Sequence, residues 1–132
     1  MITQEIDKEE MDFLKYIGGE VLELGDGYAK LGFDIKQHHK QLFGVVHGGA
    51  IATLADHCGW YAAVSVLKKE QTAVTIELKI NYLKPADGEV LRAEARVVQK
   101  SKRTVFTTIE LFSQDTLIAY STATYHILTK KE

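Results

Sequence analysis

The pattern of apolar and polar positions is most regular in the second half of the chain, where a period of two predicts β-strands. The pattern is cleanest from Thr72 to Tyr82, with an apolar side chain at nearly every second position. Turn-forming residues then separate three further alternating segments, which are residues 90–99, 103–112 and 116–128. This half of the chain is therefore expected to form four long strands in succession.

The first half of the chain predicts a short helix followed by a β-hairpin. Residues 6–17 place apolar side chains at helical spacing, and a pair of glycines ends that pattern. Residues 21–24 and 28–35 have the composition of strands and lie on either side of a Gly-Asp-Gly turn. Together these segments predict one amphipathic helix and two paired strands.

A second, longer helix is expected after a polar loop at residues 36–44. From Gly49 to Leu67 alanines dominate, and apolar side chains cover nearly every side of the helical wheel. A helix of this kind is enclosed by other structure. The order of elements predicts an α+β fold in which an antiparallel sheet curls around this helix. One proline and the absence of repeats leave little room for a domain boundary, so residues 1–132 are expected to form one domain.

Charge and cysteine content argue against several classes of protein. The net charge of −2 and the pI of about 6.2 give no electrostatic reason to expect a nucleic-acid partner or binding to an anionic membrane. The single cysteine, Cys58, cannot form an intrachain disulfide, and the N-terminus lacks the apolar run of a signal peptide. A cytoplasmic setting is therefore expected. Residues 44–67 are interrupted by His47, Asp56 and His57, which favours a buried helix over a membrane span.

Candidate chemistry begins at the start of the long helix, where His47 precedes Gly48 and Gly49. Glycines let a ligand approach the backbone closely because no Cβ intervenes. The first amides of a helix have no carbonyl partner within it, so they present N–H donors and the positive end of the helix dipole. Such a position can polarise a carbonyl group or stabilise an oxyanion. The alternative is that the glycines only allow the helix start to pack tightly.

Asp56 lies two turns into the same helix, among positions that are predicted to be buried. A buried carboxylate is costly unless it has partners or a task. Gly48 and Asp56 are eight residues apart, or roughly 12 Å along a helix, so they cannot meet at one reacting atom within one helix. Two helices packed antiparallel around a two-fold axis would bring Gly48 of one copy to Asp56 of the other. A structural aspartate, held by backbone donors or reaching water, is the alternative.

Two segments resemble the hotdog-fold acyl-CoA thioesterases of the phenylacetate-pathway, PaaI-like, type. The first runs from Gln41 to Asp56 and contains the His-Gly-Gly sequence, and the second is Ile80-Asn-Tyr-Leu-Lys-Pro-Ala86. The similarity extends over about residues 13–128. It implies a hotdog fold, a homodimer or homotetramer, and hydrolysis of an acyl-CoA thioester without a cofactor.

The resemblance also implies roles for particular residues. The Gly48 amide would polarise the thioester carbonyl, and Asp56 of the facing subunit would act as nucleophile or general base. An amide side chain near Gln41 would help to orient substrate or water. Basic side chains would lie near the CoA phosphates. Separately from the resemblance, the size of the aromatic side chains suggests an aromatic or medium-length acyl pocket. The candidates for these binding contacts are Gly49, Trp60, Tyr82, Lys84, Lys102 and Arg103.

Trp60 occupies a position, one turn beyond the acid, where some relatives carry Ser or Thr. A hydroxyl that orients water is therefore not expected there, and the indole is expected to shape or shorten the acyl pocket. This departure leaves open a binding module that captures an acyl-CoA without turnover. A hotdog dehydratase or hydratase is a third hypothesis, and it requires an acid–base histidine near the carboxylate that the sequence does not place.

The histidines and the cysteine support weaker alternatives. The five histidines show no paired spacing typical of a zinc site, so no metal is expected. His47 belongs to the candidate catalytic set, with the role of fixing the turn by hydrogen bonding rather than acid–base work. Cys58 lacks a paired histidine and is not expected to be a nucleophile.

Overall fold

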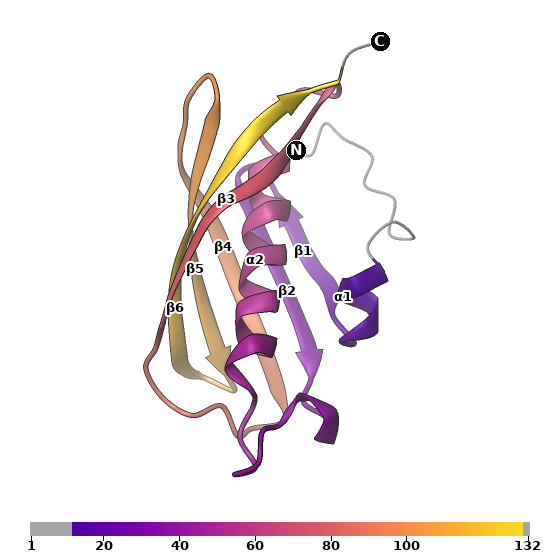
Figure 1. Ribbon diagram of the computed structural model, residues 1–132, viewed down its shortest axis with the longest axis vertical. Coiled ribbons are helices and arrows are strands. Elements are labelled where there is room, and N and C mark those ends of the chain that lie inside the picture. Colours follow the sequence, from indigo (N-terminus) through magenta and orange to yellow (C-terminus); the bar gives the residue numbers. More distant parts are fainter. Residues whose placement is uncertain (1–11, 131–132) are drawn as a thin grey trace.

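The computed structural model describes residues 12–130, which form an antiparallel sheet curled around one long helix (Figure 1). The elements in chain order are α1 (Asp12–Tyr16), β1 (Glu20–Gly25), β2 (Tyr28–Asp34), the 3-10 helix η2 (Gln37–His39), α2 (Gly48–Val64), β3 (Gln71–Tyr82), β4 (Val90–Lys100), β5 (Thr104–Ser113) and β6 (Thr116–Thr129). The six strands follow the order β1-β2-β4-β5-β6-β3, and all neighbours are antiparallel. The predicted α+β arrangement is confirmed.

The strands begin and end within one residue of their predicted boundaries. The long helix ends at Val64, three residues before the predicted end. Ser65 then diverts the chain, because its hydroxyl donates to the Ala62 carbonyl at 2.6 Å and accepts from the Gly27 N–H at 2.8 Å. The helix predicted at residues 6–17 lies partly outside the described residues, and α1 is its described part. Within residues 12–130, no helix is long and apolar enough to cross a membrane.

The hydrophobic core lies between one side of α2 and the concave face of the sheet. Fully buried side chains of α2 meet inward-facing side chains at every second position of the central strands. They include Leu54, Ala55, Cys58 and Ala62 from the helix, and Leu31, Ala93, Ala95, Ile109 and Leu111 from the sheet. Burying each leucine or isoleucine stabilises the fold by about 1.5–3 kcal/mol. This packing fixes α2 relative to the strands.

The other side of α2 forms an uncovered face. Gly49 is exposed there, and Thr53, Asp56, His57 and Trp60 are only partly buried. The prediction that the helix is enclosed on nearly every side is therefore not met within residues 12–130, which cover this face only in part. Alanine and glycine on a helix suit close packing against a neighbour, wherever that neighbour comes from.

β3 forms one edge of the sheet and contains a β-bulge at Ile76. Thr75 pairs with Tyr125 and Glu77 pairs with Thr124, so Ile76 has no partner on β6. The extra residue changes which alternating side chains face the helix. Thr75 consequently reaches α2, whereas Val74 and Ile76 are 47% and 58% exposed. Apolar side chains that simple alternation would bury therefore lie on the surface.

Candidate active site

The start of α2 presents one unused backbone N–H group. His47 is the N-cap residue, and its Nδ1 accepts a hydrogen bond of 2.9 Å from the Gly49 N–H. This is the turn-fixing contact predicted for His47. The Gly48 N–H meets no acceptor among residues 12–130. The Gly48 amide is therefore free to bind a ligand, whereas the Gly49 amide is not.

Tyr82 packs across Gly48 from the end of β3. Its hydroxyl donates a hydrogen bond of 2.9 Å to the Gly48 carbonyl. A Cβ on Gly48 would lie 3.2 Å from the Tyr82 ring, so a glycine allows this close approach. Gly48, Tyr82 and the exposed Lys84 line one cavity of 340 Å³. Two of the predicted substrate-binding residues therefore flank the helix start.

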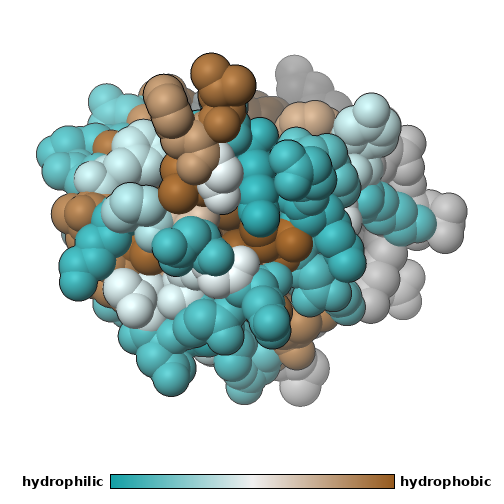
Figure 2. All heavy atoms as spheres, turned by 90° about the horizontal axis from the view of Figure 1, so that it is seen from below, coloured by the Kyte–Doolittle hydropathy of each residue, from teal (hydrophilic) through white to brown (hydrophobic). Residues whose placement is uncertain are grey.

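Gln41 lies in the loop before α2, as expected. Its N–H donates to the Val45 carbonyl at 2.8 Å, and its side-chain carbonyl accepts from the Phe43 N–H. Within the described residues, its side-chain nitrogen makes no hydrogen bond. The loop tip leaves Leu42 and Phe43 94% and 84% exposed. Figure 2 views this end of the molecule, where apolar side chains protrude.

His39 joins this loop to the rest of the chain. Its ring is buried and stacks on Phe33 with 4.1 Å between ring centroids. Nε2 donates to the Ile17 carbonyl at 2.6 Å, and Nδ1 accepts from the Lys36 N–H at 2.9 Å. The His39 carbonyl accepts from the His47 N–H at 2.7 Å. The neutral ring therefore ties the segment after α1 to the loop that sets the start of α2.

Acid is expected to destabilise the fold through His39. Burial lowers the pKa of His39 below its usual value of 6.5, because the charged ring would lose its hydration. Between the lowered pKa and 6.5 the unfolded chain binds the proton more readily, so the free energy of unfolding falls as the pH falls. The loss from this residue is at most about 1.4 kcal/mol per pH unit.

Urea unfolding of the wild type and His39→Asn across this pH range tests the prediction. His39→Asn should be less stable at neutral pH but should lose less stability on acidification. His38→Asn is the matched control, because its exposed ring lies 4.1 Å from that of His39. This control should keep most of the wild-type pH dependence, and an equal reduction in both variants would contradict the prediction.

Asp56 lies on the uncovered face of α2 and is partly buried, rather than fully buried as expected. Its Oδ1 accepts hydrogen bonds from the Thr75 hydroxyl at 2.8 Å and from the Tyr125 hydroxyl at 3.3 Å. No donor among residues 12–130 contacts Oδ2. The partners are thus side chains of the sheet rather than backbone donors, and one carboxylate oxygen remains free.

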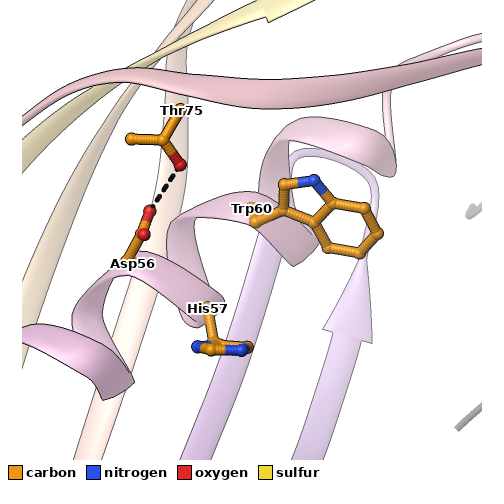
Figure 3. Close-up of a pocket in the computed structure, with 4 residues that line it drawn as sticks. All are labelled: Asp56, His57, Trp60 and Thr75. Atoms are coloured by element: carbon orange, nitrogen blue, oxygen red, sulfur yellow. Dashed lines mark hydrogen bonds between the residues drawn. The ribbon is translucent and has the colours of Figure 1, made fainter. Parts of the chain in front are cut away.

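Asp56, His57, Trp60 and Thr75 line a cavity with a volume of 200 Å³, and Figure 3 shows how their side chains lie. Thr75 reaches from β3 to the carboxylate. The Trp60 indole forms a wall of the cavity, and its N–H donates to the Ala73 carbonyl at 2.8 Å. His57 points away from the carboxylate, and its Nδ1 donates to a backbone carbonyl one turn earlier at 2.9 Å. The cavity therefore has the Asp56 carboxylate and the aromatic ring of Trp60 in its lining.

The predicted site is not assembled within one chain. Gly48 and Asp56 line separate cavities, and their spacing along α2 is roughly 12 Å. Lys84 follows β3, near the helix start, whereas Lys102 and Arg103 lie in the β4–β5 turn at the opposite end of the sheet (Figure 1). The geometry of a single chain thus leaves the candidate residues in two groups.

Thr75 and Tyr125 were missed in the sequence analysis. Thr75 occupies what alternation marks as the polar side of its strand, and nothing in the sequence reveals the bulge that turns it inward. Tyr125 is fully buried on β6. Its signal in the sequence is weak, because a tyrosine at an inward position of a strand indicates only that its hydroxyl needs a partner.

Cys58 does not serve as a nucleophile. Burial raises the pKa of its thiol to about 12, so the reactive thiolate does not form near neutral pH. Its Sγ lies 3.4 Å from each of two strand carbonyls, those of Ala29 and Ala93, and fills the core. Within residues 12–130, no group of three or more His, Cys, Asp or Glu side chains is arranged to hold a metal ion.

Comparisons with known proteins agree on one family. Residues 43–120 match the sequence profile of the thioesterase superfamily. The chain is 36% identical over 110 residues to an esterase-like protein of Saccharolobus solfataricus. The aligned region covers 83% of this chain and 72% of that protein. It is 30% identical over 96 residues to acyl-coenzyme A thioesterase 13 of Homo sapiens, covering 70% of this chain and 68% of that protein.

Solved structures show the same architecture. A thioesterase family protein of Silicibacter pomeroyi superposes with a TM-score of 0.88 at 28% identity, covering 92% of this chain and 93% of that chain. A variant of the phenylacetic acid degradation protein PaaI of Thermus thermophilus gives a TM-score of 0.81 at 28% identity, covering 87% and 97%. The matched region contains both Gly48 and Asp56. With its antiparallel sheet around one helix, the chain therefore belongs to the thioesterase superfamily and is a thioester hydrolase with a hotdog fold.

Proposed function

We propose that the protein hydrolyses acyl-CoA thioesters at a site formed between two copies of the chain. The observation that carries this proposal is a pair of unused groups on α2, the Gly48 N–H and the Asp56 Oδ2. The N–H can donate to an oxyanion, and the carboxylate oxygen can take a proton or attack a carbonyl carbon. Similarity to acyl-coenzyme A thioesterase 13 supports CoA as the thiol part of the substrate.

The reaction follows from these two groups. The thioester carbonyl oxygen accepts a hydrogen bond from the Gly48 N–H, which draws electron density from the carbonyl carbon. Asp56 Oδ2 takes a proton from a water molecule while the water oxygen forms the new C–O bond. The tetrahedral intermediate then breaks its C–S bond, and the departing CoA thiolate receives the proton. In the alternative route, Oδ2 attacks the carbonyl carbon first and the C–S bond breaks to release CoA as its thiolate. Water then hydrolyses the resulting mixed anhydride and supplies the proton that the thiolate takes up.

Two features favour a homodimer with the site at its interface. β3 is an edge strand of 12 residues, and its outer side pairs with no other strand of residues 12–130. The uncovered face of α2 lies beside β3, whose Thr75 side chain contacts Asp56. A partner related by a two-fold axis would run its own α2 antiparallel and bring its Asp56 towards Gly48. A tetramer could be built from two such dimers.

The basic residues fit CoA in the same arrangement. In a dimer of this symmetry, the β4–β5 turn of one copy lies at the same end as the α2 start of the other. Lys102 and Arg103 of one copy would then join Lys84 of the other around the CoA phosphates. Trp60 and Tyr82 would line the acyl side of the site.

The residues around the helix start would have supporting roles. The free side-chain nitrogen of Gln41 would donate to substrate or water. His47 and Gly49 would hold the first turn of α2 in place through their own hydrogen bond. With the turn fixed in this way, the neighbouring Gly48 N–H would be available to the carbonyl oxygen of the substrate.

A panel of aryl, short-, medium- and long-chain acyl-CoA thioesters, assayed with a thiol reagent, tests the proposed function. At least one class should release CoA with saturable kinetics. Thioesters of N-acetylcysteamine, which lack the CoA nucleotide, should show a higher KM because the basic residues then find no phosphates. Tight binding of an acyl-CoA without release of CoA would contradict hydrolysis and favour a binding module.

A further inference from the structure

We propose that Tyr125 is a positioning residue that orients the Asp56 carboxylate, and that Gly59 is needed to admit the Tyr125 hydroxyl. This inference rests on the proposed function, because it assigns a supporting role at the same acid. Tyr125 lies on β6 and is completely buried. Its hydroxyl donates to two acceptors of a single residue, the Asp56 main-chain carbonyl at 2.9 Å and Oδ1 at 3.3 Å.

Sharing one phenolic proton between the backbone and the side chain of Asp56 restricts the carboxylate relative to the helix. A side chain held only by solvent would sample several rotamers. Here both acceptors belong to Asp56, so rotation of the carboxylate away from Tyr125 would break one contact. Misplacement of a catalytic group by about 1 Å can cost a hundredfold in rate. Loss of the contact between Tyr125 and Asp56 is therefore expected to lower the rate of turnover.

Tyr125 and Thr75 act on the same oxygen from neighbouring strands. They are directly paired residues in the β3–β6 ladder, and both hydroxyls donate to Oδ1. Thr75 is exposed, whereas Tyr125 is shielded from water, so the Tyr125 hydroxyl has no solvent competing for its proton. Two donors on Oδ1 direct Oδ2 towards the open cavity, where the substrate would bind.

The Tyr125 hydroxyl remains a donor throughout the working pH range. Burial raises its pKa, and the negative charge of Asp56 raises it further, because both disfavour the phenolate. The phenol therefore keeps its proton while Asp56 is charged. A donor that never ionises can hold the carboxylate at any pH at which the acid is active.

Gly59 opens the space that the hydroxyl occupies. A Cβ at this position would lie 2.3 Å from the Tyr125 oxygen and 3.1 Å from Thr107 Oγ1. Glycine is otherwise disfavoured in the interior of a helix, so its place at this point of α2 calls for a steric reason. Contact with a rigid, buried phenol supplies that reason. Any larger residue must move the ring that holds Asp56.

Tyr125→Phe removes the hydroxyl and keeps the ring, so it tests the contact directly. We expect kcat on the best acyl-CoA to fall about ten- to a hundredfold with KM nearly unchanged, because the loss falls on orientation of the acid rather than on binding. Tyr61→Phe is the matched control, since Tyr61 is also a buried tyrosine but makes no hydrogen bond to Asp56. It should leave kcat close to that of the wild type.

Gly59→Ala provides a second, independent variant. It should lower both Tm and kcat, because the new methyl group displaces the Tyr125 hydroxyl. Adding Tyr125→Phe to Gly59→Ala should restore much of the lost Tm but none of the lost kcat. A wild-type kcat in Tyr125→Phe, or the same kcat loss in the Tyr61 control, would overturn the inference. If Asp56→Asn itself kept full kcat, the proposed function would fail instead.

Discussion

Asp56→Asn is expected to lower kcat on the best acyl-CoA by about 10²–10⁴-fold, the range that a general base contributes. Asparagine keeps the size of the side chain and offers an oxygen to the Thr75 and Tyr125 hydroxyls, so the fold should be retained. It cannot accept a proton from water or attack the thioester carbon. Steady-state release of CoA measures the loss, and Asp56→Ala should lose at least as much.

A matched control distinguishes this effect from a general loss of negative charge. Asp115 lies exposed in the β5–β6 turn, and Asp115→Asn should keep the wild-type kcat. Full kcat in both Asp56 variants would rule out a catalytic carboxylate and the proposed mechanism with it. Label found in the Asp56 carboxylate after a single turnover in ¹⁸O-labelled water would establish attack by Oδ2, because that label enters when water hydrolyses the mixed anhydride at the Asp56 side-chain carbon.

Gly48→Pro is expected to lower kcat by about 10²–10³-fold, because it removes the N–H that would polarise the carbonyl. Proline is well tolerated at the first position of a helix. The preceding His47, with φ −61° and ψ 136°, already has the extended backbone that a residue before proline requires. The lost N–H has no acceptor in the described chain, so little stability should be lost with it.

Gly48→Ala is the control for this substitution. Its Cβ also lies 3.2 Å from the Tyr82 ring, but the N–H remains. It should therefore retain most of the wild-type kcat. Equal losses in the alanine and proline variants would indicate that crowding of Tyr82, rather than loss of the donor, causes the defect.

Mixing the two inactive variants tests whether the site spans two subunits. A dimer of one Asp56→Asn copy and one Gly48→Pro copy contains one intact site, made of Gly48 from the first and Asp56 from the second. Random exchange makes half of the dimers mixed, so activity should return to about a quarter of the wild-type value. Recovery that stays near zero after verified exchange would contradict a shared site.

Much of the fold was predictable because it depends on local periodicity. Where apolar residues alternate without interruption, as in β5 and β6, the predicted strand ends agree with the structure to within one residue. The strand predicted from Thr72 to Tyr82 is also confirmed, but its regular alternation is interrupted at Ile76, which has no partner on β6. Whether a strand forms a bulge depends on how it pairs with its neighbour, and that information lies on another part of the chain.

The candidate site was predictable only where its residues share one helix. Gly48 and Asp56 belong to one short motif, so their spacing revealed both their presence and their separation. Thr75 and Tyr125 lie 19 and 69 residues from Asp56, and strand pairing alone brings both to the same oxygen. The uncovered face of α2 was unpredictable for a related reason. Small residues suit close packing, but they do not reveal which chain provides the neighbour.

The bulge in β3 allows one strand to reach both functional positions of the helix. Tyr82 follows Thr75 by seven positions, an odd number, so in a regular strand the two side chains would point to opposite sides of the sheet. The unpaired Ile76 adds one extra residue to β3, so that Thr75 and Tyr82 lie on the same side of the sheet. Thr75 can then touch Asp56 while Tyr82 touches Gly48. Adding or removing one residue between them would turn one of the two contacts away from the helix.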